Sequence, residues 1–148
     1  HRSEAQEFCW LAEPWDKTYL GFEDQALTGR LQPFMMARCL DARLALAKLP
    51  VAESMSSGSV VVLLTDKMIE RNNHLLQLRT SPGKLEAVST LEQEEVTMDM
   101  GAFTQLYFGA FSASELWEAG HIKCSDVRKL QLLDELFPKC RTYNNEYF

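Results

Sequence analysis

The chain has 148 residues, of which 46% are hydrophobic and 24% are charged, and its formal net charge is −6. This balance is typical of a soluble globular domain whose core needs no disulfide or metal to stabilise it. The acidic charge argues against nucleic acid as a partner, and no apolar run is long enough to cross a membrane. Acidity is compatible with a cationic small-molecule substrate, or simply with solubility.

Residues 1–30 differ from the rest of the chain, and we interpret them as the end of a preceding domain plus a linker. Phe8–Leu11 is a short apolar run that Glu13-Pro14 ends, and Gly21 and Gly29 interrupt the mixed stretch after it. Because the chain opens at His1 on polar residues, we expect it to be a fragment of a longer protein.

A second unit is expected over residues 31–148. Phe34–Leu40 is mostly apolar and predicts a buried strand. Asp41 is placed to cap a short helix over Ala42–Lys48, which Pro50 ends.

The next segments predict a central strand followed by a hairpin. Ser59–Thr65 is rich in β-branched residues, as expected of a strand in the middle of a sheet. His74–Thr80 and Lys84–Ser89 alternate in polarity on either side of Ser81-Pro-Gly83, which has the composition of a tight turn.

The last third of the chain predicts helices after one more strand, Glu95–Met98. Asp99 is placed to cap a helix over Met100–Phe108, and Ser112–Glu115 has the pattern of a capping box. Ser125 is expected to cap the final helix, whose shared apolar face comprises Val127, Leu130, Leu133 and Phe137. This order predicts an α+β fold, a mainly antiparallel sheet with helices packed on one side.

Metal and nucleophile chemistry find little support in the sequence. The four cysteines, Cys9, Cys39, Cys124 and Cys140, lack paired spacing, which favours reduced thiols in a cytoplasmic protein. The histidines are scattered, so no metal site is expected, and no familiar catalytic motif is present.

Two clusters leave alternatives open. Glu92, Glu94, Glu95 and Asp99 could hold a cation, although charges that protect an edge strand are the favoured interpretation. Phe103, Tyr107 and Phe111 recur at helical spacing, which favours a place in the core. Trp10 and Trp15 follow no helical face and could line a pocket at a domain junction.

The C-terminal tail that begins at Pro138 carries aromatic residues and ends on the carboxylate of Phe148. One interpretation is a structural pin that buries Tyr143 and Phe148. The other is chemical, because a carboxylate in a poorly solvated cleft becomes a usable base. Glu146 and Tyr147 could assist such a base through a charge and a hydroxyl.

Three segments of the chain resemble the C-terminal part of Eis-like GNAT N-acetyltransferases. They are Phe34-Met-Met-Ala-Arg-Cys-Leu-Asp-Ala-Arg43, Gly101-Ala-Phe-Thr-Gln-Leu-Tyr-Phe-Gly109, and Leu133-Asp-Glu-Leu-Phe-Pro-Lys139 with the terminal Asn-Glu-Tyr-Phe148. The first fourteen residues similarly resemble the end of the domain before it. The resemblance implies that residues 31–148 form a sterol-carrier-protein-like domain.

The resemblance also implies a function for the tail. In such enzymes the C-terminal carboxylate is the general base that deprotonates an amine substrate, and here that role would fall on Phe148. Glu146, Tyr147, Trp10 and Trp15 are then candidates for substrate binding. Acetyl-CoA, the co-substrate, would be bound by a domain absent from this chain, so the fragment alone is expected to be inactive.

The resemblance further implies an amine substrate, for which an aminoglycoside-like molecule is one candidate, and a homo-oligomer as the full-length protein. The alternative that the fold itself suggests is a lipid- or sterol-carrier-like binding module.

Overall fold

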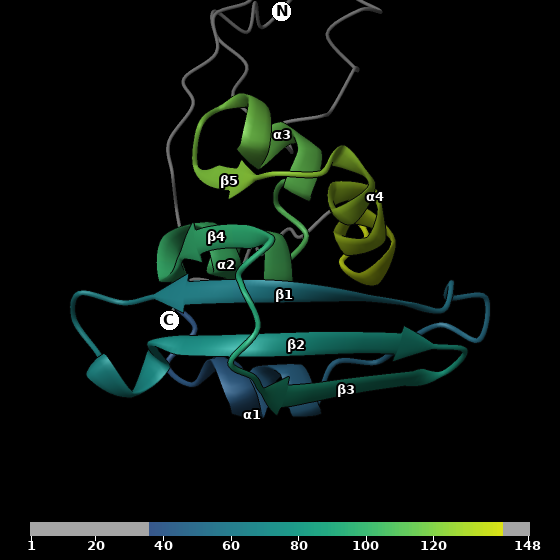
Figure 1. The fold of residues 1–148 in the computed structure, drawn as a ribbon. Coiled ribbons are helices and arrows are strands. Elements are labelled where there is room, and N and C mark those ends of the chain that lie inside the picture. The colour runs from purple at the N-terminus through teal and green to yellow at the C-terminus, as the bar shows by residue number, and fades with distance from the viewer. Residues whose placement is uncertain (1–35, 141–148) are drawn as a thin grey trace, which may run out of the picture. The chain divides into compact units, whose positions relative to one another are not determined.

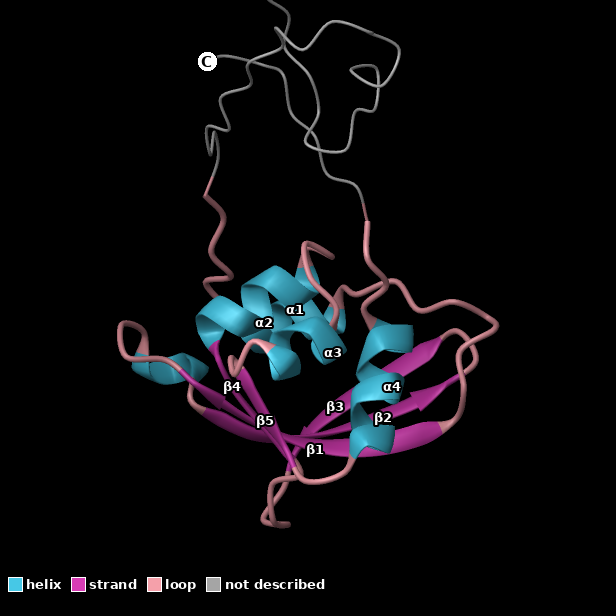
Figure 2. Ribbon diagram, turned by 90° about the horizontal axis from the view of Figure 1, so that it is seen from above, coloured by secondary structure: helices cyan, strands magenta, loops and turns pink. Residues whose placement is uncertain are grey.

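The computed structural model describes residues 36–140, and Figures 1 and 2 show how their elements are arranged. One helix precedes four strands, and three helices and a short fifth strand follow them, with a short 3-10 helix, η2, after the first strand. The elements in chain order are α1 (Ala42–Ala47), β1 (Gly58–Thr65), η2 (Glu70–Asn72), β2 (His74–Ser81), β3 (Lys84–Ser89), β4 (Val96–Asp99), α2 (Met100–Tyr107), α3 (Ala113–Glu118), β5 (Ile122–Cys124) and α4 (Val127–Leu136).

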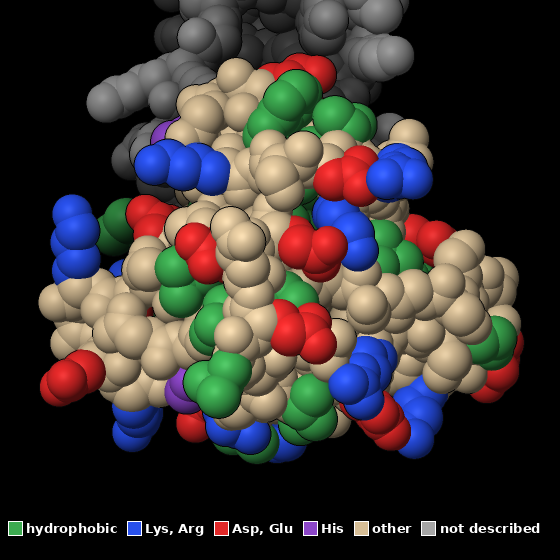
Figure 3. All heavy atoms as spheres, in the orientation of Figure 1, with side chains coloured by type: hydrophobic (Ala, Val, Ile, Leu, Met, Phe, Trp, Pro, Cys, Tyr) green, Lys and Arg blue, Asp and Glu red, His purple; other side chains and the backbone are tan. Residues whose placement is uncertain are grey.

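The five strands form one sheet in the order β3-β2-β1-β4-β5. Only the β1–β4 pair is parallel, so the sheet is mainly antiparallel and β1 is its central strand, as the sequence predicts. Residues 90–95 connect β3 to β4 by crossing β2 and β1 (Figure 1). On that face, acidic and basic side chains are interspersed with apolar ones (Figure 3).

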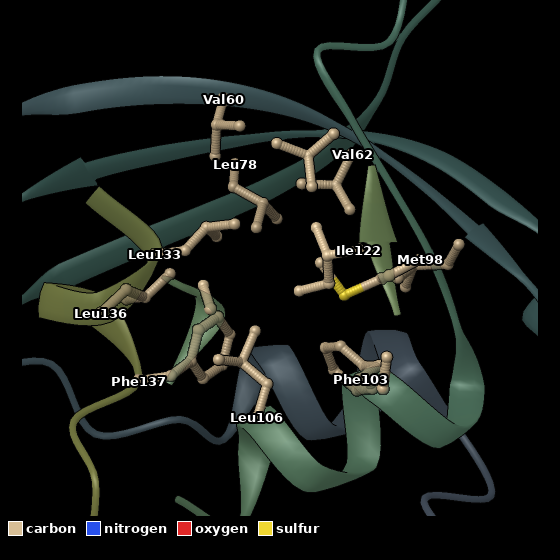
Figure 4. Packing of buried hydrophobic residues seen from close by; sticks show 14 of the residues in the cluster. Val60, Val62, Leu78, Met98, Phe103, Leu106, Ile122, Leu133, Leu136 and Phe137 are labelled. Atoms are coloured by element: carbon tan, nitrogen blue, oxygen red, sulfur yellow. The ribbon is translucent and has the colours of Figure 1, made fainter. Parts of the chain in front are cut away.

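The four α-helices cover the other face of the sheet (Figure 2), which confirms the predicted α+β fold. Strand residues that point toward the helices, such as Val60, Val62 and Leu78, are buried. They face Leu106 and Leu133 across the interior (Figure 4). The core therefore lies between the sheet and the helices, as the period-two burial of a one-sided sheet requires.

The predicted caps Asp41, Asp99 and Ser112 and the predicted turn at Ser81-Pro-Gly83 are confirmed. The side chains of Asp41 and Asp99 accept hydrogen bonds at the N-termini of α1 and α2, and Ser112 and Glu115 form a reciprocal capping box on α3. Gly83 has φ +68 in the two-residue turn between β2 and β3, a conformation that favours glycine.

The strand predicted over Phe34–Leu40 is wrong for the part of it that the structure describes. Residues 36–40 belong to no strand, and Leu40 is 59% exposed while Cys39 is buried. Side chains from distant elements bind this segment in place of a neighbouring strand, so an apolar run alone was a misleading signal.

The start of the final helix also needs correction. The cap of α4 is Asp126, whose side chain accepts from the Arg128 backbone, and not Ser125. Val127 is half exposed and does not share the buried face formed by Leu130 and Leu133. No sequence pattern predicted the short strand β5 that precedes this helix.

The charged-edge interpretation of the acidic cluster is wrong, because β4 is an internal strand between β1 and β5. Glu95 accepts a hydrogen bond from the Val61 backbone at 2.9 Å and pairs with Lys129 at 3.0 Å. Asp99 is occupied as the cap of α2. These carboxylates therefore join elements of the fold.

Candidate functional site

The predicted site residues Phe148, Glu146, Tyr147, Trp10 and Trp15 lie outside the described residues. Their roles stay predictions. The structure does show how residues 138–140, the first of the tail, contact the domain, together with two spaces and one buried polar cluster that bear on function.

The first residues of the tail are bound to the turn between α2 and α3. The Cys140 N–H donates to the Gly109 carbonyl at 3.1 Å, and the Cys140 thiol donates to the Phe108 carbonyl at 3.0 Å. Lys139 pairs with Glu115 at 2.7 Å. The origin of the tail is thus attached to the domain by three polar contacts.

Gly109 permits this attachment because it has no side chain. A Cβ at this position would lie 2.7 Å from the Cys140 nitrogen and 2.8 Å from the Pro138 carbonyl oxygen. Its φ of +66 also lies in the left-handed region that L side chains rarely adopt.

Aromatic packing fixes the same region from within. Phe137, the residue before Pro138, is buried and meets Phe103 edge-on at a centroid distance of 6.2 Å, and Tyr107 packs beside both rings. Phe103 and Tyr107 therefore belong to the core, as predicted. Phe111 does not, because it lies beyond α2 and is 47% exposed.

A surface hollow of about 530 Å³ lies beside the attachment point. It combines apolar and acidic groups from α2, α3 and the turns that follow them. Its lining residues are Gln105, Phe111, Glu115, Leu116, Glu118, Ala119 and His121. The hydrogen bond from Lys139 lowers the pKa of Glu115, which is therefore ionised at neutral pH. The sequence did not reveal this hollow because its walls come from separate elements.

The space between the sheet and the helices is almost filled. Its volume is about 10 Å³, and it is enclosed by apolar side chains that include Leu64, Leu76 and Met98. A space of this size holds about one water molecule at most. This space therefore has no room for an acyl chain or a sterol.

A buried polar cluster lies where β1 ends. The Asp66 carboxylate accepts hydrogen bonds from Arg38 at 2.6 Å, from Asn72 at 2.9 Å, and from the backbone N–H groups of Met68 and Ile69. These bonds, with that from Asn72 the largest influence, lower the pKa of Asp66 to about 2. Met68, Ile69 and Asn72 closely follow Asp66 in the chain, but Arg38 lies 28 residues away, so no sequence motif indicated the whole cluster.

The described cysteines Cys39, Cys124 and Cys140 are free. Burial raises the pKa of both Cys39 and Cys124, so these two thiols are protonated at neutral pH and are poor nucleophiles. Within residues 36–140, no three His, Cys, Asp or Glu side chains are grouped to hold a metal. No helix of this range combines the length and apolarity that a membrane span needs.

Comparison with known proteins places residues 42–145 in the family described as the sterol carrier protein domain. No curated protein matches the chain in sequence.

Solved structures of larger proteins contain the same fold. A GCN5-related N-acetyltransferase from Anabaena variabilis matches with a TM-score of 0.70 and 19% identity, over 88% of this chain and 33% of that one. One from Kribbella flavida matches with a TM-score of 0.66 and 24% identity, over 75% and 29%. Eis1 from Mycobacterium abscessus matches with a TM-score of 0.58 and 18% identity, over 73% and 26%. The chain thus spans about a quarter to a third of these relatives.

Proposed function

Because the chain belongs to the sterol carrier protein domain family and its fold recurs within larger N-acetyltransferases, we propose that it is the C-terminal domain of an Eis-like, acetyl-CoA-dependent N-acetyltransferase that acts on an amine. The observation that carries this proposal is the fold likeness to part of much longer proteins, of which this chain covers 26% to 33%. Acetyl-CoA would be bound by a domain outside this chain. The substrate is an amine, for which an aminoglycoside-like molecule is one candidate.

We assign the general base to the carboxylate of Phe148. An ammonium group cannot attack a carbonyl because its lone pair is occupied, so a positioned base must first remove a proton. The carboxylate takes that proton, the amine nitrogen forms a bond to the thioester carbon, and the carbon–sulfur bond breaks to release coenzyme A. Glu146 and Tyr147 would hold the cationic substrate, and Trp10 and Trp15 would line its cleft.

The contacts of Lys139 and Cys140 support this assignment, because a terminal base must be positioned to be effective. They fix Lys139 and Cys140, and Cys140 lies eight residues before Phe148.

The test uses the full-length protein and three changes at its end. Deletion of Tyr147-Phe148 removes the base, and one glycine added after Phe148 displaces the carboxylate. Phe148→Leu keeps the carboxylate in place and is the matched control. We expect kcat to fall about 100-fold or more in the first two variants, with the KM for acetyl-CoA unchanged. Full activity after the deletion would exclude the tail as the base.

Lipid binding is the second candidate function, and the family description alone favours it. The interior space of about 10 Å³ argues against it.

The full-length protein is further expected to be a cytoplasmic homo-oligomer.

A further inference from the structure

The sheet ends on one side at β3, a regular edge strand. Figure 1 shows β3 at the lower margin of the sheet with α1 behind it, and within residues 36–140 no strand pairs with its outer side. Its register with β2 is unbroken from Lys84 to Ser89, so β3 contains no bulge, and it contains no proline. Natural sheets usually protect an edge of this kind, because its unpaired backbone groups can bind another chain.

The register of the β2–β3 hairpin shows which backbone groups point outward. Antiparallel strands alternate between residue pairs that exchange both backbone hydrogen bonds and pairs that exchange none. The Thr90 N–H donates to the Leu75 carbonyl at 3.2 Å, and these two residues lie opposite each other in the same register. Counting back in steps of two, the residues of β3 that bond to β2 are Lys84, Glu86 and Val88. The residues whose N–H and carbonyl groups point away from the sheet are Leu85, Ala87 and Ser89.

These outward groups have no hydrogen-bond partner among the described residues. The nearest backbone bond on this side runs from the Gly83 N–H to the Ala52 carbonyl at 3.0 Å, in the turn before β3. The opposite edge of the sheet, β5, has only three residues and offers much less to a partner strand. Of the two described edges, β3 is therefore the one at which a further strand can be added.

Charged side chains often protect edge strands, but on β3 they cancel each other. Leu85 and Ala87 pack against the core, so alternation places Lys84 and Glu86 on the opposite face of the strand. Lys84 and Glu86 form an ion pair at 2.6 Å, and Val88 beside them is 40% exposed. The edge strand thus carries no net charge, and electrostatic repulsion does not oppose the approach of an identical strand.

We propose that β3 pairs with β3 of a second copy of this chain, in antiparallel orientation, and joins the two sheets into one. Pairing about a two-fold axis at Ala87 places Leu85 opposite Ser89 of the second copy, so all the outward groups of both strands find partners. Glu86 then lies opposite Val88 of the second copy, which keeps like charges from facing each other directly. This pairing is independent of the proposed acetyl transfer, because it needs only β3.

Backbone hydrogen exchange in the full-length protein tests which groups pair. At high protein concentration we expect the amides of Leu85, Ala87 and Ser89 to be protected, and to lose this protection on dilution to the monomer. The amides of Glu86 and Val88 are the internal control, since their bonds to β2 protect them at both concentrations. Protection of Ala87 that persists in the monomer would show that the same chain covers the edge, and would overturn the proposal.

Exchanging the charges tests whether two copies meet at this edge. Glu86→Lys leaves two lysines on the outer face of β3, and Lys84→Glu leaves two glutamates. We expect either variant alone to pair about 10-fold more weakly than the wild type, because like charges then face each other. An equimolar mixture of the two should recover the pairing. Glu94→Lys is the matched control, because Glu94 is exposed and lies outside β3.

Native mass spectrometry of the full-length variants over a dilution series measures these differences. Ala87→Pro gives a second check, since it removes an outward N–H without removing a bond to β2. A wild-type protein that stays monomeric would overturn the proposal. An oligomer whose mass and dilution profile are unchanged in Glu86→Lys and Lys84→Glu would do so as well, since its copies would then meet at another surface.

Discussion

Gly109 is the residue on which the attachment of the tail depends. Both Gly109 and Gly120 have positive φ values, +66 and +79, so alanine at either position is strained by about 1–2 kcal/mol. Only at Gly109 would the new methyl group also collide with backbone, that of Pro138 and Cys140, whereas nothing lies within 4 Å of the Gly120 position.

We therefore expect Gly109→Ala to release residues 138–140, and Gly120→Ala to leave them in place. Hydrogen exchange of the Cys140 amide in the two variants measures this difference. If the tail supplies the base, Gly109→Ala should also lower kcat of the full-length protein more than Gly120→Ala does. Equal protection of Cys140 in both variants would contradict the steric argument.

Asp66 predicts a specific dependence of stability on pH. Its pKa in the folded chain is about 2, below the ordinary value of 3.8, so ionisation favours the folded state. This contribution is present above about pH 4 and is lost as the pH falls through about 2. We expect the melting temperature of the wild type to drop across this window, and that of Asp66→Asn to start lower and change less.

Glu86→Gln is the control for Asp66→Asn. The hydrogen bond from Lys84 lowers the pKa of Glu86 as well, but both side chains are about half exposed, so solvent screens their interaction. A pH profile for Asp66→Asn that parallels the wild type would show that the charge of Asp66 does not stabilise the folded domain.

Residue-level predictions from the sequence succeeded where partners are neighbours in the chain. Asp41, Asp99 and Ser112 were identified as caps because each one bonds three residues ahead. Asp66 and Arg38 are 28 residues apart, and Cys39 and Thr104 are 65 apart. No local pattern connects such pairs, so these two hydrogen bonds could not be predicted from the sequence.

At the scale of elements, the sequence prediction and the structure differ at the N-terminus of α4. Asp126 bonds the Arg128 N–H, whereas the Ser125 hydroxyl reaches only the Glu95 carbonyl at 3.4 Å. We expect Asp126→Ala to lower the melting temperature and Ser125→Ala to leave it nearly unchanged. Ser112→Ala, which removes the cap of α3, should cost about 1 kcal/mol in urea denaturation and is the reference.

The elements that the sequence predicted well have strong internal patterns. β2 and β3 alternate in polarity around a turn that contains Gly83, and β1 is rich in β-branched residues. β5 has three residues and exists because β4 pairs with it, so its own composition carries almost no signal. The prediction for residues 36–40 failed for the opposite reason. Their apolar composition suggested a strand, but tertiary contacts exclude one.

At the scale of the whole molecule, the filled interior predicts that the domain does not bind lipid. We expect no saturable binding in a titration with a fluorescent fatty acid, because the interior space is only about 10 Å³. Leu133→Ala should create room there and destabilise the domain by about 2–5 kcal/mol, while exposed Leu91→Ala should change neither property. Saturable binding to the wild type would favour the carrier function instead.

The hydrogen bond from Cys39 to Thr104 joins residues 65 apart in the sequence, and this separation has a consequence for folding. Strands β1 to β3 are close in sequence, and contacts of this kind form early because little chain entropy opposes them. The bond from Cys39 to Thr104 joins chain segments on either side of these strands, so we expect it to form after the folding transition state. Stopped-flow measurements on Thr104→Val should then show faster unfolding with an unchanged folding rate. Residue 39 would therefore be bound to α2 only in domains that have completed folding.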